Sequence, residues 1–308
     1  MKTLLSTREV SALMNVTETT IKRWADADEL PCVRTLGGHR KFTMNDVMKF
    51  AEIHSYPLTG VLTPNVDAGD RDTLEFSVQT RNYRKASELL LDEALRGEGE
   101  RLIQLLSYFL KHGIPVSTAA DEIIRPAMVE IGELWKSGKL EVNEEHLASH
   151  ALLEAIIRLS PELHRKPSNN LTAVCACAEG EHHEIGLRLL AYVLESQGWT
   201  VKYLGVNTPF DTLRAYLKVA KPDLVCLSYT LSLPDKKFIE QVRSVGRLAH
   251  SLDAAFMVGG FFAGKFTPGD FLCEHISSSA SDTVSYLRDR FQLKPGPKPK
   301  KPAEAEPA

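Results

Sequence analysis

The spacing of apolar residues changes along the chain and therefore predicts separate domains. In residues 1–54, apolar positions at helical spacing follow Ser6, Thr17 and Thr43, three residues that can cap a helix. Short segments on either side of Gly37-Gly38 alternate apolar and basic residues, which predicts a β-hairpin between the second and third helices. The first 54 residues are thus expected to form one small domain of three helices and a hairpin.

The remaining pattern predicts a linker, a helical domain, a sheet domain and a tail. Residues 55–75 carry prolines and glycines without clear periodicity, as linkers do. Residues 76–165 show helical spacing in four stretches, which predicts a four-helix bundle. In residues 168–292, strand-length apolar runs alternate with helices, which predicts a flavodoxin-like, doubly wound, five-stranded parallel sheet. The tail, 293–308, is proline-rich and expected to be disordered.

Composition narrows the range of functions. The 308 residues are 43% apolar and 25% charged, as in ordinary globular proteins. A net charge of -3 provides no overall attraction for nucleic acid, so any such contact must be local. The five cysteines form no Cys-x-x-Cys pair, which argues against a disulfide framework or a zinc site. No apolar run reaches roughly 18 residues and no signal peptide is evident, so we expect a cytoplasmic protein without a membrane partner.

Polar and basic residues gather on the second helix and on the hairpin of the first domain. These candidate DNA contacts are Thr19, Thr20, Lys22, Arg23, Arg34, Gly38, His39, Arg40 and Lys41. Basic side chains and backbone amides at a glycine-rich turn suit phosphate contacts. A solvated charged turn is the alternative, but this cluster directly follows a helix-turn-helix pattern.

The segment TREVSALMNVTETTIKRWADADELPCVRTLGGHRKFTMNDV resembles the winged-helix DNA-binding domain of the MerR family, including its excisionase-like members. The Arg-x-x-Gly-Gly-His-Arg wing and Trp24 in the second helix carry the resemblance. It implies binding to double-stranded promoter DNA. Because Asp26, Asp28 and Glu29 dilute the positive charge, one copy should bind weakly, which favours a dimer or tetramer on repeated half-sites.

Polar residues and glycines follow three of the predicted strands. They are Glu181, His183 and Gly186 after the first strand, Ser228 and Thr230 after the third, and Gly259 and Gly260 after the fourth. The carboxyl ends of parallel strands form the usual ligand edge of such a sheet, and glycine lets a bulky group approach the backbone. A histidine there could be a metal ligand, a general base or a polar loop residue. The whole set favours a long crevice with one metal-binding imidazole at its mouth.

This set resembles the cobalamin-binding domain shared by methionine synthase, corrinoid methyl carriers and cobalamin-dependent regulators. The shared pattern is Glu-x-His-x-x-Gly, then Ser-x-Thr, then Gly-Gly. The resemblance implies that His183 replaces the dimethylbenzimidazole base as the lower axial cobalt ligand and that Glu181 orients the imidazole. It also implies roles for the smaller residues: Gly186 gives clearance, Ser228 and Thr230 line the pocket of the nucleotide tail, and Gly259 and Gly260 bound it.

A second resemblance concerns the predicted bundle. On the residues alone, Trp135 would be a core residue and Glu145-His146 a surface ion pair. The run EIGELWKSGKLEVNEEHLAS, however, resembles the helical cap of cobalamin-binding regulators. It implies that Trp135 covers the upper face of the corrin and that Glu145 and His146 contact an adenosyl group. The implied cofactor is adenosylcobalamin.

Together the three segments resemble the CarH/LitR type of light-responsive repressor. The resemblance implies a DNA-binding homotetramer in the dark that dissociates when light cleaves the cobalt–carbon bond. One departure is Lys136, which stands where light-sensing members carry a cobalt-capturing histidine. A lysine is protonated at neutral pH and is a poor ligand, so His146, His150 or water would have to take that role.

Two other functions remain open at the sequence level. One is a corrinoid methyl-carrier subunit of a methyltransferase, which would not need a DNA-binding domain. The other is a regulator that senses cobalamin or another tetrapyrrole without light. Since the chain shows no catalytic acid–base pair or nucleophile motif, we do not expect an enzyme.

Overall fold

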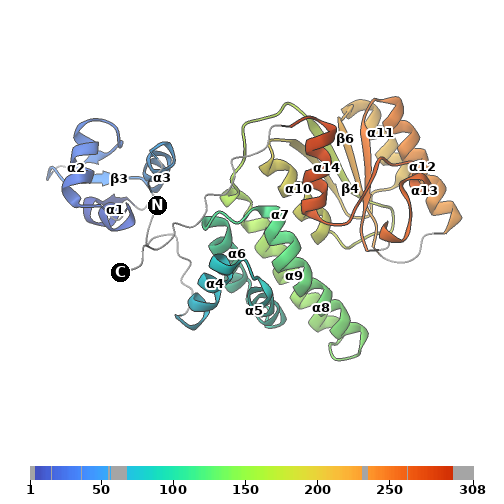
Figure 1. The fold of residues 1–308 in the computed structure, drawn as a ribbon, viewed down its shortest axis with the longest axis horizontal. Coiled ribbons are helices and arrows are strands. Elements are labelled where there is room, and N and C mark those ends of the chain that lie inside the picture. Colours follow the sequence, from blue (N-terminus) through green and yellow to red (C-terminus); the bar gives the residue numbers. More distant parts are fainter. Residues whose placement is uncertain are drawn as a thin grey trace. The chain divides into compact units, whose positions relative to one another are not determined.

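The computed structural model describes residues 4–14, 16–35, 37–54, 56, 68–230, 235–261 and 263–293. The chain divides into two compact units, Met1–Asp67 and Ala68–Ala308, shown in Figure 1. The predicted tail beyond residue 293, and the part of the predicted linker from 57 to 67, lie outside the described residues. No helix in the described ranges is long and apolar enough to cross a membrane.

The first unit is a three-helix domain with a small antiparallel sheet. Its elements in order are β1 (Leu5–Ser6), α1 (Thr7–Met14), α2 (Glu18–Asp26), β2 (Val33–Arg34), β3 (Arg40–Phe42) and α3 (Met44–Ile53). The strands lie in the order β1-β3-β2, so the predicted hairpin is present. The sequence pattern did not predict β1, because two residues whose partner strand lies far along the chain leave no periodic signal.

The predicted caps fix where these helices begin. The amide of Glu9 donates to Ser6 Oγ at 3.3 Å, and the amide of Ser6 donates to the Glu9 carboxylate at 2.6 Å. Thr17 accepts from the Thr20 amide at 3.2 Å, and Thr43 accepts from the Asp46 amide at 3.1 Å. Each bond satisfies a first-turn group that the helix cannot pair internally. The helices then bury one apolar core, which includes Leu13, Ile21, Trp24, Phe42 and Phe50.

The second unit begins with a helical bundle. Its elements are α4 (Ala68–Thr80), α5 (Arg84–Leu95), α6 (Gly99–Lys111), α7 (Val116–Ala119), the π-helical turn η1 (Ala120–Ile124), α8 (Arg125–Lys136), α9 (Val142–Arg158) and the short η2 (Ser160–Glu162). The prediction that the linker extends to residue 75 is wrong, because α4 begins at Ala68 and its Leu74 is fully buried against the bundle. A helix with few buried apolar positions shows little periodicity in the sequence.

The sheet domain follows the bundle. Its strands are β4 (Thr172–Cys177), β5 (Thr200–Gly205), β6 (Leu224–Ser228), β7 (Ala255–Gly259) and β8 (His275–Ser277), all parallel and in the order β5-β4-β6-β7-β8. This confirms the predicted flavodoxin-like sheet. After β4 the chain adds β5 on one side, and it then adds β6, β7 and β8 on the other. The strand order therefore reverses between β4 and β6, which is where such sheets open a ligand crevice at their carboxyl edge.

Helices cover both faces of the sheet, as Figure 1 shows. On one face, α11 (Phe210–Ala220), α12 (Lys236–Ser251) and α13 (Pro268–Phe271) pack against Val174 and Ala176 of β4. On the other, α10 (Ile185–Ser196) and α14 (Ala280–Arg290) pack against Ala173, Cys175 and Cys177. Alternate residues of β4 therefore supply two cores, which explains its continuous apolar run. The short η3 (Ala263–Lys265) follows β7.

Bundle and sheet domain are joined through the π-helical turn. The Asp121 carboxylate accepts hydrogen bonds from the amides of Ala280 and Ser281, at 2.7 and 2.8 Å, in the first turn of α14. Arg125 donates to the Ser278 carbonyl at 2.7 Å. A carboxylate at a helix N-terminus is favourably placed for charge as well as for hydrogen bonding. These contacts hold η1 against the sheet domain.

Candidate functional site

The loop after β4 is held in place by hydrogen bonds to the loop after β5. Gly180 has φ +84°, a left-handed conformation that favours glycine, and its amide donates to Asn207 Oδ1 at 2.8 Å. The Asn207 amide in turn donates to the Glu181 carbonyl at 2.8 Å. Sequence reasoning missed Asn207, although a polar residue just after a strand of this edge was a signal for it. The loop thus presents residues 181–183 from a fixed backbone.

Glu181 carries a fully buried carboxylate. Its Oε1 accepts from His183 twice, from the backbone amide at 2.7 Å and from Nδ1 at 2.7 Å, and its Oε2 accepts from the Thr230 amide. Burial acts to raise the pKa of this carboxyl, but the hydrogen bonds from His183 and Thr230 outweigh burial and lower it. The carboxylate therefore stays charged and fixes the ring orientation of His183.

His183 is oriented on one side and open on the other. Its side chain is 61% exposed, and Nε2 makes no hydrogen bond within the described ranges. The hydrogen bond to Glu181 raises the pKa of His183, burial opposes this, and the charges of Glu181 and Glu145 add to the increase. Because Nδ1 keeps its proton towards Glu181, the neutral ring offers its lone pair at Nε2. This is the arrangement expected of a metal-binding imidazole.

The ends of β6 and β7 lie beside this loop. Ser228 is buried and pairs in register with Cys177 on one side and Gly259 on the other. Gly260 has φ +115°, and a Cβ there would lie 2.0 Å from the Tyr229 carbonyl oxygen. Gly260 is therefore required by its own backbone, whereas Gly259 has no neighbour nearer than 3.6 Å to such a Cβ. Gly186, at the start of α10, has open space around it, and its role in clearance stays a prediction.

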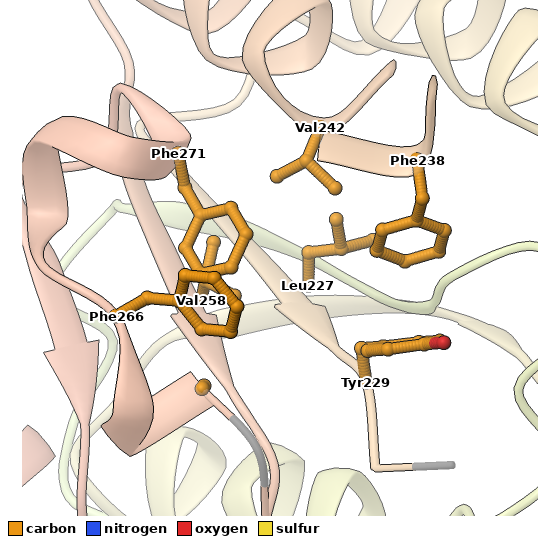
Figure 2. Close-up of a pocket in the computed structure, with 8 residues that line it drawn as sticks. Leu227, Tyr229, Phe238, Val242, Val258, Phe266 and Phe271 are labelled. Carbon is orange, nitrogen blue, oxygen red and sulfur yellow. The ribbon is translucent and has the colours of Figure 1, made fainter. Parts of the chain in front are cut away.

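A small apolar cavity lies between β6, β7 and the helices α12 and α13 (Figure 2). Two ring pairs surround it, Tyr229 with Phe238 at 4.1 Å between centroids and Phe266 with Phe271 at 5.0 Å. These rings leave about 10 Å³, room for a single water at most. A nucleotide tail beside Ser228 and Gly260 would therefore require these rings to move.

The bundle residues predicted to cap the site lie at the end of α8 and the start of α9. Trp135 is 50% exposed, so it is not the core residue that its sequence position alone suggests. Glu145 accepts from Ser149 Oγ at 2.6 Å, and His146 Nε2 lies 3.7 Å from the other Glu145 oxygen. Lys136 pairs with Glu133 at 3.2 Å and is largely exposed. Since Glu145 influences the pKa of His183, the start of α9 lies within electrostatic reach of the loop.

The residues present fit a corrinoid. Large apolar side chains are exposed on the loops after β5 and β7, at Val206 and Phe261, and on the bundle at Trp135. A wide apolar ring system can cover such side chains, which otherwise face water at a cost. No cluster of three or more histidine, cysteine or acidic residues that could hold a metal occurs among the described residues. A single axial imidazole, with the macrocycle supplying the other ligands, is consistent with this donor set.

In the first unit, the structure brings two predicted DNA contacts to one acidic residue. Asp26, the last residue of α2, accepts from Arg34 at 2.8 Å and from Arg40 at 2.5 and 2.8 Å. The hydrogen bond from Arg40 is the main cause of the lowered pKa of Asp26. The Arg40 side chain is only 18% exposed. Asp26 thus links the wing to the second helix, a function that the sequence did not indicate.

The other predicted DNA contacts remain on the surface of this unit. Thr19, Lys22, Arg23, Gly38 and His39 are exposed, whereas Thr20 and Lys41 are half-buried. The Thr20 hydroxyl is paired with the Thr17 hydroxyl at 2.9 Å, and Lys22 lies 3.9 Å from Glu18. The turn of the wing is closed by the Gly38 amide, which donates to the Thr35 carbonyl at 2.8 Å, with Gly38 at φ +76°.

Comparison with known proteins identifies these domains. Residues 4–54 match a helix-turn-helix domain, residues 86–160 match a B12 binding domain, and residues 171–276 match another. The chain thus joins a DNA-binding domain to a cobalamin-binding module and belongs to the class of cobalamin-binding transcriptional regulators.

Two curated relatives and one solved structure refine this class. The chain is 28% identical over 217 residues to the HTH-type transcriptional repressor CarH of Myxococcus xanthus, covering 67% of this chain and 71% of that protein. It is 32% identical over 123 residues to the repressor CarA of the same organism, covering 40% and 41% respectively. These similarities support a CarH-type cobalamin-binding regulator. The monomethylamine corrinoid protein of Methanosarcina barkeri shares the fold, with a TM-score of 0.52 and 16% identity over 68% of this chain and 99% of that one.

Proposed function

We propose that this protein is a repressor whose assembly and DNA binding are controlled by adenosylcobalamin. The observation that carries the proposal is the pair formed by His183 and the buried Glu181 at the ligand edge of the sheet. It presents one open imidazole nitrogen to a metal, in a chain that also carries a winged helix.

His183 would hold the cobalt through Nε2, while Glu181 accepts the Nδ1 proton and keeps the ring in position. Trp135 would cover the corrin, and Glu145 and His146 would contact its adenosyl group. Ser228 and Thr230 line the pocket of the nucleotide tail after the surrounding aromatic rings have moved apart. Gly259 bounds that pocket and Gly186 leaves room at the start of α10.

Bound adenosylcobalamin would supply a cobalt–carbon bond that visible light breaks. The chain's part is to couple the presence of the adenosyl group to assembly. Residues on α8 and α9 contact the adenosyl group only while it is attached, so the ligand favours one arrangement of the bundle. Lys136 pairs with Glu133 and, as a protonated amine, would be a poor ligand for the cobalt once the adenosyl group has left. His146 and His150, both exposed on α9, are the candidate captors.

The decisive experiment is gel filtration with adenosylcobalamin in darkness and after green light, alongside binding to a promoter fragment. We expect a tetramer that binds DNA in the dark and smaller species that release it in the light. An unchanged size and DNA affinity under all conditions would refute the switch. His183→Ala should lose the red-shifted spectrum of histidine-bound cobalamin, and Lys136→Ala, the control, should not change the spectrum of the illuminated protein.

A corrinoid methyl carrier is the second candidate. The bundle and sheet together share their fold with a monomethylamine corrinoid protein, which favours it. A methyl carrier, however, would need neither the helix-turn-helix domain nor the adenosyl contacts of Trp135, Glu145 and His146. Methyl transfer from the methylated corrinoid to a thiol, without salt-sensitive DNA binding, would support the carrier and overturn the regulator.

A further inference from the structure

A second crevice lies at the edge of the sheet opposite to the His183 loop. It has a volume of about 280 Å³, close to the lower end of ligand pockets, which occupy about 300–1,000 Å³. Residues 166–169, which precede β4, form one side, and the end of α10 and the second half of α14 form the others. Because α10 begins at Ile185, beside the cobalt-binding loop, its length of about 18 Å separates the two sites.

The walls of the crevice are apolar and its rim is basic. The walls are formed by Val193, Leu194, Trp199, Val284, Leu287 and Leu293. The charged residues of the lining are Lys166 and Arg288, and no acidic residue lines the crevice. Ser168, Asn169 and Gln197 add polar groups at the rim. An apolar interior with a few convergent polar groups is the usual composition of a small-molecule site.

The two cations lack a counter-charge. Lys166 Nζ donates to Gln197 Oε1 at 2.6 Å, and neither Lys166 nor Arg288 forms an ion pair with a carboxylate in the described ranges. Burial lowers the pKa of Lys166, and the charge of Arg288 lowers it further. Lys166 is half-buried and Arg288 is exposed, so the crevice carries two positive charges at its rim. An anion bound between them would relieve their mutual repulsion.

We propose that this crevice binds a small amphipathic anion, with its carboxylate at Lys166 and Arg288 and its apolar part against α10 and α14. The volume admits a short acyl chain or a single ring. The proposal is independent of the cobalamin site, because no residue is shared between them.

Equilibrium dialysis of radiolabelled octanoate against the full-length, cobalamin-loaded protein in the dark tests it. Cobalamin occupies the other site, so octanoate cannot be counted there. We expect one saturable site per chain and a loss of affinity of about tenfold for each charge removed in Lys166→Gln and Arg288→Gln. Lys218→Gln removes an exposed charge from α11, away from the crevice, and should bind as the parent protein does.

A further variant separates the apolar part of the site from its charges. Val284→Phe narrows the crevice while both cations remain, and it should also weaken octanoate binding. Far-ultraviolet circular dichroism of each variant should match the parent, which excludes misfolding as the cause. Non-saturable binding, or equal binding by Lys166→Gln, Arg288→Gln and Lys218→Gln, would overturn the proposal. Cobalamin binding, measured separately, would remain intact in that case.

Discussion

Replacing Glu181 by glutamine tests how the buried carboxylate controls His183. The glutamine side chain has one acceptor oxygen, whereas the carboxylate accepts from His183 on one oxygen and from Thr230 on the other. Whichever way the amide turns, its NH₂ group faces an N–H donor, and a buried donor is left unsatisfied. An unsatisfied buried group costs about 1–3 kcal/mol. Loss of a group that orients a metal-binding histidine lowers metal affinity about 10- to 100-fold.

We therefore expect Glu181→Gln to unfold at lower urea concentration and to bind cobalamin about 10- to 100-fold more weakly in the dark. Spectroscopic titration with adenosylcobalamin gives the affinity, and the position of the visible band reports whether histidine is bound. Glu179→Gln is the matched control, because its exposed carboxylate accepts only a longer bond from the Phe210 amide, at 3.3 Å. It should retain both stability and affinity.

A Glu181→Gln protein that binds cobalamin as tightly as the parent, with the same histidine-bound spectrum, would refute this role of Glu181. In that case the backbone of the loop, held by Asn207, would be sufficient to position His183. A loss of stability without a loss of affinity would likewise assign Glu181 to folding alone.

Three further predictions concern other parts of the chain. Asp26→Asn should release Arg34 and Arg40 to reach phosphates, so that DNA binding strengthens. The slope of log affinity against log salt concentration should then steepen by about 0.9 per added contact, whereas Asp28→Asn should leave this slope unchanged. Weaker DNA binding by Asp26→Asn with an unchanged slope would contradict this. Gly260→Ala should lower the free energy of unfolding by more than the roughly 1–3 kcal/mol of backbone strain, because its Cβ would also meet the Tyr229 carbonyl oxygen. Gly259→Ala should spare stability and weaken cobalamin binding, since that residue bounds the proposed tail pocket. Burial acts to raise the pKa of Asp282, but the hydrogen bonds from Ser278 and the charge of His275 outweigh burial and lower it. The contribution of Asp282 to stability is therefore present above about pH 3.9 and is lost as pH falls through the pKa of Asp282 in the folded protein. Asp282→Asn should therefore show a shallower loss of thermal stability between about pH 4 and pH 2 than the parent, and an identical acid profile would refute this assignment.

The order of elements in the sheet domain could be predicted from sequence because the central strands β4, β6 and β7 are buried on both faces. The apolar run of β4, for example, supplies both cores and has no polar interruption. Glycines and polar residues then mark where each strand ends, which located Glu181, His183, Ser228 and the Gly259-Gly260 pair at one edge. The parallel order follows from helices of crossover length between the strands.

The beginning of the bundle was not predictable in the same way. Leu74 and Ser77 are the buried residues of α4, and such a narrow face gives no repeating pattern. The contact between the π-helical turn and the first turn of α14 was also missed. The two segments lie far apart in the sequence, and no local pattern marks their pairing. Contacts between residues far apart in the chain become visible only in three dimensions.

By itself the sequence determined the periodicity of the helices and strands, the caps that begin them, and the residue types available at the ligand edge. Those features depend on neighbours a few residues away, so they are written locally. The tertiary structure decided which polar groups pair. It buried Glu181 between His183 and Thr230, and it joined Asp26 to the two arginines of the wing. The charge and direction of a side chain depend on its partners and its burial, and folding sets both by bringing distant segments together.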